Sequence, residues 1–121
     1  KIHALFKNQD ERLEAKQRIM ELGNLSISDS MGTNLEINAP GVNKGMGLIQ
    51  LGRLLGIERE EIMACGDGNN DLMMLKEVGF GVAMANGADE VKEVADYITL
   101  SNEEDGVAAA IEKFVLNPER G

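Results

Sequence analysis

Hydrophobic and polar positions in the first third of the chain follow two different periods. The apolar run at residues 2–6 predicts a strand. The wider spacing of apolar residues after it predicts a helix, with Asp10 as its candidate cap and Gly23 near its end. Residues 25–28 and 35–37 then alternate between apolar and polar side chains, as half-buried strands do. The predicted order of this part is therefore strand, helix, strand, strand.

After Pro40 the pattern changes, and helix-like and strand-like runs alternate one for one. Helices are predicted over residues 44–55, 70–78, 88–94 and 105–115, and strands over residues 62–66, 80–84 and 97–99. Strands that alternate with helices along a chain form a parallel sheet. The predicted fold class is α/β, with one unit over residues 1–36 and a second over residues 37–121.

The charge and composition of the chain limit the kinds of molecule that it is expected to bind. The 121 residues carry a net charge of −9, which argues against binding to nucleic acid or to an anionic membrane, because both need clustered Lys and Arg. A phosphate-bearing substrate is compatible with this charge, since a bound metal and one lysine reverse the local field. Cys65 is the single cysteine, so no intramolecular disulfide forms, and no apolar run approaches the ~18 residues of a membrane span. We therefore expect a cytoplasmic protein that binds neither nucleic acid nor membranes.

The most polar segment of the second unit lies between a predicted strand and the helix after it, and reads Gly66-Asp67-Gly68-Asn69-Asn70-Asp71. In an open α/β sheet, ligands bind at the carboxyl ends of the strands. At such an end Asp67 and Asp71 would repel each other unless a cation lay between or beside them. The segment therefore predicts a site for Mg²⁺ and a phosphate.

Three other interpretations of this segment compete. Asp67, Asn69 and Asp71 match the first half of an EF-hand loop, but Leu72 stands where that loop needs Gly and Val78 where it needs Glu. A dinucleotide fingerprint fails because its third Gly is replaced by Asp71. A plain polar turn explains the Asn and Asp residues but does not require two acids this close.

Lys44 is the second candidate, at the start of the helix predicted over 44–55. A lysine there opposes the helix dipole, unless an anion is shared between the helix amides and the ammonium group. The Walker pattern is not met, because no Gly-Lys-Ser/Thr occurs. Alone, Lys44 is typical of a surface lysine; with the acid cluster, it predicts phosphate binding.

The remaining polar candidates are predicted to be structural. His3 is the only histidine and lies in an apolar run without neighbouring Cys, His or acid residues. Cys65 follows the apolar strand residues and is expected to be a small core residue. Asn86, Asn102 and Asp105 are expected to be turn and cap residues.

Several motifs together resemble a known family. The segment from Gly66 to Asp71, with Met74-Leu75 after it, resembles the fourth conserved motif of the haloacid dehalogenase superfamily of phosphohydrolases. Lys44 is placed like that superfamily's third-motif lysine. Segments 79–88, 91–96 and 102–107 are in addition similar to the Cof-type sugar-phosphate phosphatases.

The resemblance covers about residues 35–112, while residues 1–33 resemble the end of that family's α/β cap domain in element order only. It implies that the chain is the C-terminal half of a Rossmann-like parallel-sheet hydrolase core, preceded by the end of an α/β cap domain. Residues 1–36 would be the remnant of the cap, and residues 37–121 the C-terminal part of the hydrolase core.

The resemblance also implies a role for each site residue, with Mg²⁺ as the cofactor. Asp67 ligates Mg²⁺, and Asp71 supports the metal shell or pairs with Lys44. Asn70 hydrogen-bonds the phosphoryl group, and Lys44 neutralises the phosphate and the attacking carboxylate. These roles suit phosphoryl transfer, where positioning and charge neutralisation supply most of the catalysis.

One part of the family pattern is missing. The family's nucleophile is the first aspartate of an Asp-x-Asp motif, and no Asp-x-Asp occurs in this sequence; the second-motif Ser or Thr cannot be placed either. We therefore expect the parent protein to hydrolyse a small phosphorylated metabolite through an aspartyl-phosphate, and this chain alone to be inactive. We also expect the chain to form a homodimer or to associate with the missing N-terminal half, because exposed strand edges and apolar surface favour association.

Two alternative functions stay open on the sequence. A phosphoserine phosphatase-like enzyme shares the Gly-Asp-Gly-x-Asn-Asp pattern, although residues 1–36 suggest a cap just before Lys44. A non-catalytic module that binds a divalent cation or a phosphorylated ligand would need no nucleophile.

Overall fold

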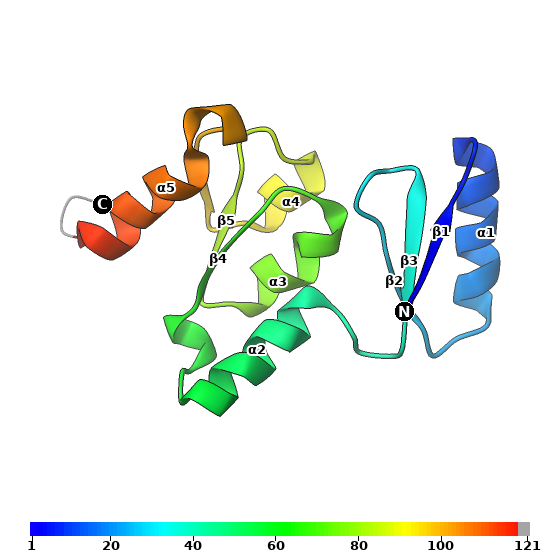
Figure 1. Ribbon diagram of the computed structural model, residues 1–121, viewed down its shortest axis with the longest axis horizontal. Coiled ribbons are helices and arrows are strands. Elements are labelled where there is room, and N and C mark those ends of the chain that lie inside the picture. The colour runs from blue at the N-terminus through cyan, green and yellow to red at the C-terminus, as the bar shows by residue number, and fades with distance from the viewer. Residues whose placement is uncertain (119–121) are drawn as a thin grey trace.

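Two three-stranded sheets organise residues 1–118, which are the residues that the computed structural model describes (Figure 1). The first sheet is antiparallel, with β3 (Asn34–Asn38) between β1 (Ile2–Leu5) and β2 (Ser26–Ser28). One helix, α1 (Gln9–Glu21), connects β1 to β2 and lies beside this sheet. The predicted order of strand, helix, strand, strand is confirmed for this part of the chain.

The cap of α1 is not the predicted one. Asn8 precedes the helix with an extended backbone, and its Oδ1 accepts a hydrogen bond from the amide of Glu11 at 2.9 Å. Asp10 lies inside the first turn, where its negative charge is favourable near the positive end of the helix dipole. The Phe6 amide donates to the Thr33 carbonyl at 3.0 Å, so the chain still follows the sheet there and Asn8 is the first capping residue after it.

The second sheet is parallel, with the order β4 (Met63–Gly66), β5 (Phe80–Ala83), β6 (Tyr97–Ile98). Its helices are α2 (Lys44–Leu55), α3 (Leu72–Glu77), α4 (Asp89–Val94) and α5 (Gly106–Ile111). The predicted α/β fold class with a parallel sheet is confirmed.

Two of the predicted helices are irregular at one end. The helix predicted over 70–78 begins as a 3₁₀ turn, Asn69–Asp71, before α3. The helix predicted over 105–115 is α5 followed by one wider π-helical turn, Glu112–Leu116. Further 3₁₀ turns precede β4 and α5, at Arg59–Glu61 and Asn102–Glu104.

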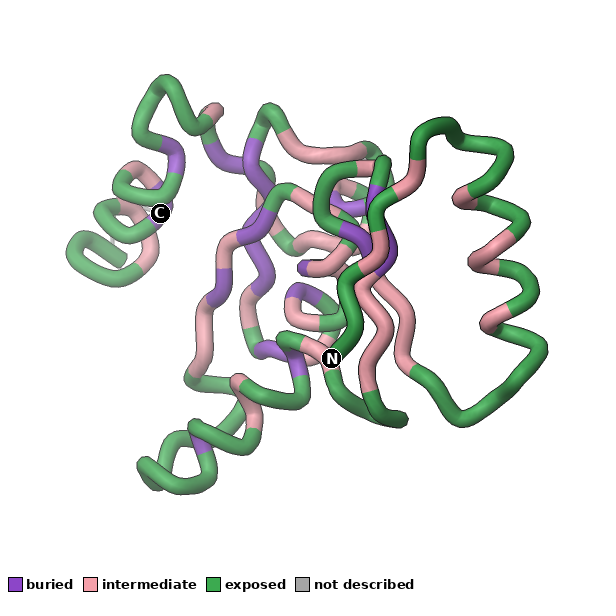
Figure 2. Tube along the Cα trace, turned by 45° about the vertical axis from the view of Figure 1, so that its right-hand side comes forward, coloured by how far each residue is buried: buried purple, intermediate pink, exposed green. Residues whose placement is uncertain are grey.

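Buried residues are concentrated in the parallel unit, as the purple segments of Figure 2 show. The main cluster lies between the first two strands of the parallel sheet and the helices beside them, and consists of Ala64, Leu75, Val78, Ala83 and Val91. Side chains three apart in a strand point to opposite faces, so Phe80 lies on the other face from Ala83. There its ring packs 4.7 Å from Phe114, which follows α5, measured between ring centroids.

The outer edge of β4 pairs with no strand in the part of the chain that the structure describes, since β4 is the end of the order β4, β5, β6. Several apolar side chains of α2 are also exposed, among them Leu51, Leu54 and Leu55. No helix among residues 1–118 is long and apolar enough to cross a membrane. Antiparallel pairing ends at Asn38 and α2 begins at Lys44; the division into a cap remnant at 1–36 and a hydrolase core at 37–121 stays a prediction.

Candidate active site at the ends of the parallel strands

The loop after β4 is closed by one of its own carboxylates. Asp71 Oδ2 accepts hydrogen bonds from the amides of Asp67 at 3.0 Å and of Gly68 at 3.2 Å. The Asp71 side chain folds back so closely over Gly66 that a Cβ at Gly66 would lie 2.6 Å from the Asp71 Cβ. Only glycine fits at this position, because any larger side chain would collide with the Asp71 side chain that closes the loop.

Lys44 reaches the same carboxylate from α2. Its Nζ lies 2.7 Å from Asp71 Oδ1, although the two residues are 27 positions apart. Asn43 caps α2 by accepting the Met46 amide at 2.9 Å. Helix α2 packs closely on α3, since a Cβ at Gly45 would lie only 2.8 Å from a backbone oxygen of α3. This close packing brings the lysine within reach of Asp71.

The two ends of this ion pair differ in exposure. The side chain of Asp71 is 7% exposed and that of Lys44 is 51% exposed. Burial raises the pKa of Asp71, but the hydrogen bonds from Lys44 and from the two loop amides outweigh it, so the pKa is lowered overall. Asp71 is therefore an anion at neutral pH, and it holds an ammonium group whose outer side is free to meet a ligand.

Asp67 is held by its backbone and free at its side chain. Its amide donates to Asp71, and its carbonyl accepts the Ala88 amide at 2.9 Å. Within residues 1–118 no hydrogen bond or ion pair engages its exposed carboxylate. Asp67, Asp71 and Lys44 line one cavity of about 400 Å³.

This donor set fits a partial Mg²⁺ site. Mg²⁺ is commonly held by one or two carboxylates, with waters and phosphate oxygens as the other ligands. Asp67 offers a free carboxylate, whereas both oxygens of Asp71 already accept from nitrogen donors. No group of three or more His, Cys, Asp or Glu side chains in the described range is placed to hold a metal ion. Of the two roles implied for Asp71, pairing with Lys44 has the better geometry.

Asn70 faces the first sheet and not the cavity that Asp67 and Asp71 line. It lines a second cavity of about 440 Å³, and Lys44 lines both cavities. The structure thus places Asp67 and Asp71 on one side of the lysine and Asn70 on the other.

Sequence reasoning missed the polar residues that the first sheet contributes to this second cavity. Ser28 and Glu36 are register partners in β2 and β3, and Ser28 Oγ donates to Glu36 Oε2 at 3.5 Å. The hydrogen bond from Lys1, 3.1 Å away, lowers the pKa of Glu36. Alternation placed Ser28 and Glu36 at polar positions of their strands, but it did not show that this face of the sheet is turned toward Asn70.

The other polar candidates have structural contacts. His3 Nε2 lies 2.8 Å from the side-chain nitrogen of Asn34, and the Asn102 amide donates to Asn86 Oδ1 at 2.8 Å. Asp105 has a left-handed backbone with φ of 57° between a 3₁₀ turn and α5. Cys65 is half-buried rather than a core residue, and it lines the cavity of Asp67 and Asp71. Burial raises the pKa of its thiol, which disfavours the reactive thiolate.

Comparison with known proteins identifies the family. The sequence profile of the family described as haloacid dehalogenase-like hydrolase matches residues 1–111. The chain belongs to this family. The resemblance of the motifs to the haloacid dehalogenase superfamily is therefore confirmed.

Among curated members of this haloacid dehalogenase-like family, the 5-amino-6-(5-phospho-D-ribitylamino)uracil phosphatase YcsE of Bacillus subtilis is 47% identical over 111 residues, which are 92% of this chain and 45% of that protein. A solved haloacid dehalogenase-like hydrolase from B. subtilis matches with a TM-score of 0.89 and 32% identity, over 93% of this chain and 40% of that one. The subclass IIB sugar phosphatase BT4131 matches with a TM-score of 0.80 and 34% identity, over 85% of this chain and 40% of that one. The chain spans less than half the length of these relatives.

Proposed function

We propose that the complete protein is a Mg²⁺-dependent phosphatase of the Cof type that hydrolyses a small, sugar phosphate-like metabolite in the cytoplasm. The observation that carries the proposal is the pair of Lys44 and Asp71 beside the free carboxylate of Asp67, all on one cavity at the end of β4. The names of the relatives support the reaction class, since YcsE and BT4131 are both described as phosphatases.

Each residue has a task that follows from its surroundings. The half-exposed ammonium of Lys44 neutralises a phosphoryl oxygen, and the buried charge of Asp71 keeps that ammonium in place. The carboxylate of Asp67 is the chain's direct ligand for Mg²⁺, which when bound supplies further charge neutralisation at the phosphoryl group. The side-chain amide of Asn70 donates to the phosphoryl group from the side of the first sheet.

The nucleophile lies outside this chain under the proposal. Because the sequence holds no Asp-x-Asp, the carboxylate that forms the aspartyl-phosphate belongs to the remainder of the complete protein. The edge of β4 that pairs with no strand among residues 1–118 is where that remainder can add a strand. The chain alone is then inactive, and it associates through this edge with the missing half or with a second copy.

The test is a phosphatase assay on the complete protein with a panel of sugar phosphates, with Mg²⁺ or with a chelator. We expect turnover that needs Mg²⁺ and falls about 100- to 1,000-fold in Asp67→Asn. Asp10→Asn is the matched control, because Asp10 is an exposed aspartate in the first turn of α1. Full activity of Asp67→Asn, or the same activity of the wild type with chelator as with Mg²⁺, would contradict the proposal.

A second candidate is favoured by the missing nucleophile. The chain would then be a non-catalytic module for a divalent cation or a phosphorylated ligand. Sub-millimolar binding of Mg²⁺ with inorganic phosphate to this chain alone, measured by calorimetry, would support the module. Phosphoserine in the substrate panel tests the phosphoserine phosphatase-like alternative, which requires it to be the preferred substrate.

A further inference from the structure

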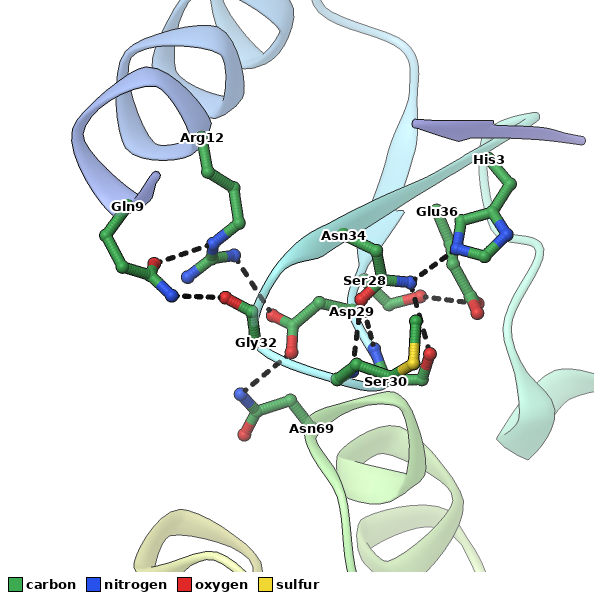
Figure 3. Close-up of polar contacts among 11 residues, drawn as sticks. His3, Gln9, Arg12, Ser28, Asp29, Ser30, Gly32, Asn34, Glu36 and Asn69 are labelled. Atoms are coloured by element: carbon green, nitrogen blue, oxygen red, sulfur yellow. Dashed lines mark hydrogen bonds and ion pairs between the residues drawn. The ribbon is translucent and has the colours of Figure 1, made fainter. Parts of the chain in front are cut away.

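Asp29, in the turn between β2 and β3, forms the most deeply buried ion pair among residues 1–118 (Figure 3). Its partner is Arg12 of α1, and the two side chains are 9% and 12% exposed, respectively. In each of the other three ion pairs of the described range, at least one side chain is 40% exposed or more. Neither residue has a task in the proposed reaction.

The pair is not optimised for stability. Arg12 Nη1 lies 3.6 Å from Asp29 Oδ2, which is too long for a hydrogen bond, and this buried nitrogen has no hydrogen-bond partner in the described range. Two buried charges in such geometry recover little of their desolvation free energy. Because the ion pair with Arg12 stabilises the fold little, we expect the charge of Asp29 to serve a second contact.

That second contact crosses from the first sheet to the loop of the candidate active site. Asn69 Nδ2 donates to Asp29 Oδ1 at 3.4 Å, over a separation of 40 residues. Asn69 directly precedes Asn70, and both of them line a cavity of about 360 Å³ together with Asp29. Figure 3 shows the side chain of Asn69 pointing from the loop below toward Asp29 above it.

The turn that carries Asp29 is fixed by hydrogen bonds with other side chains of the first unit. Asn34 is fully buried, and its Oδ1 accepts the amides of Ser30 at 3.1 Å and Met31 at 3.0 Å. The Gln9 side-chain amide donates to the Gly32 carbonyl. Asp29 therefore projects from a fixed turn, and its oxygen gives Asn69 a fixed acceptor.

We propose that Asp29 is a positioning residue that acts through Asn69 to orient Asn70 for the phosphoryl group. The inference rests on the proposed function, and it adds a link by which the antiparallel unit sets the geometry of the phosphate-binding loop. An ionised carboxylate is a stronger acceptor for an amide than a neutral group, so the charge of Asp29 matters for this link.

The experiment measures the KM and the inhibition constant of inorganic phosphate in the complete protein, because neither quantity depends on how much of the enzyme is folded. We expect Asp29→Asn and Asn69→Ala each to raise both constants about tenfold, while kcat changes less, since small misplacements of a binding group reach up to ~100-fold. The double variant should be no worse than Asn69→Ala alone, because both changes break one link. Lys7→Met, at an exposed residue of the first unit, is the control for unspecific effects.

A variant without buried charge covers the case in which Asp29→Asn does not fold. Arg12→Met with Asp29→Leu removes both charges, and such replacements are often tolerated; it should raise the phosphate constant as much. Unchanged KM and phosphate constants in folded Asp29→Asn, or in this double variant, would overturn the inference, as would additive effects of Asp29→Asn and Asn69→Ala. Failure of the proposed function is a separate result, because it is read from Asp67→Asn.

Discussion

The parallel and the antiparallel units of this chain have different interiors. The parallel unit buries an apolar cluster that includes Leu75 and Val91, at 1% and 0% exposure. In the antiparallel unit α1 buries no residue fully, and the deepest positions are Leu35 and the polar Asn34. One unit is thus held by close-packed apolar side chains and the other to a larger degree by hydrogen bonds and a buried ion pair.

The two interiors contribute differently to the candidate site. The residues with proposed chemical roles all lie in the parallel unit, which the apolar cluster fixes; they are Lys44, Asp67, Asn70 and Asp71. The antiparallel unit contributes polar groups that face the same loop, with Asp29 touching Asn69. Seven substitutions, six of them in matched pairs, test this contrast.

Lys44→Met should lower kcat/KM of the complete protein about 100- to 1,000-fold, because the ammonium is proposed to neutralise the phosphoryl group. Lys7→Met, at an exposed lysine of the antiparallel unit, should change it less than about twofold. Steady-state kinetics on the two variants gives the comparison. Equal losses in both would mean that the chemistry is not confined to the parallel unit.

Leu75→Ala should lower the free energy of unfolding by about 3 kcal/mol, since it empties a site in the apolar cluster. Leu13→Ala in α1 should cost less than about 0.5 kcal/mol, because Leu13 is 52% exposed. Urea unfolding of both variants measures the difference. A cost at Leu13 that matches the cost at Leu75 would remove the contrast between the two interiors.

Asp71→Asn should lower the free energy of unfolding by about 1–2 kcal/mol at pH 7, because the acceptor of Lys44 and of two loop amides loses its charge. The pKa of Asp71 is lowered in the folded state, so its contribution is fully present above the ordinary aspartate pKa of about 3.9. It is lost as the pH falls through the lowered pKa of the folded protein. Unfolding measured from pH 7 downwards should therefore show wild type and variant converging at acid pH, and a constant difference would contradict this account.

Asn8→Ala should lower the stability of the first unit by about 1 kcal/mol, because it removes the cap of α1. Asp10→Ala should cost only a few tenths of this, since Asp10 acts through the helix dipole alone. Thermal unfolding followed by circular dichroism compares the two. A larger loss in Asp10→Ala would restore the cap that the sequence pattern predicted.

The parallel unit was predictable from the sequence because its signals are local. The apolar strand before Gly66, the acid cluster after it and the helix from Lys44 each follow from a short pattern. Helix α3 begins later than the sequence pattern predicts, because the Asp71 side chain turns back to the amides of Asp67 and Gly68 and imposes a 3₁₀ turn first.

The polar contacts of the antiparallel unit were not predictable, because they depend on long-range packing. Nothing next to Asp29 in the sequence indicates that it is buried against Arg12 and Asn69, 17 residues before it and 40 after it. The cap of α1, by contrast, has a local signal in the sequence, since Asn8 and Glu11 have the spacing of a capping box.

We propose that Asp67 supplies the chain's ligand to Mg²⁺ in a phosphate-binding site. The most direct measurement is the Mg²⁺ concentration that half-activates the complete protein, determined for wild type, Asp67→Asn and Asp10→Asn. We predict that Asp67→Asn needs at least about 10- to 100-fold more Mg²⁺, the range seen when a metal site loses a supporting group, and that Asp10→Asn does not differ from wild type. The same half-activating concentration in all three proteins would contradict the account.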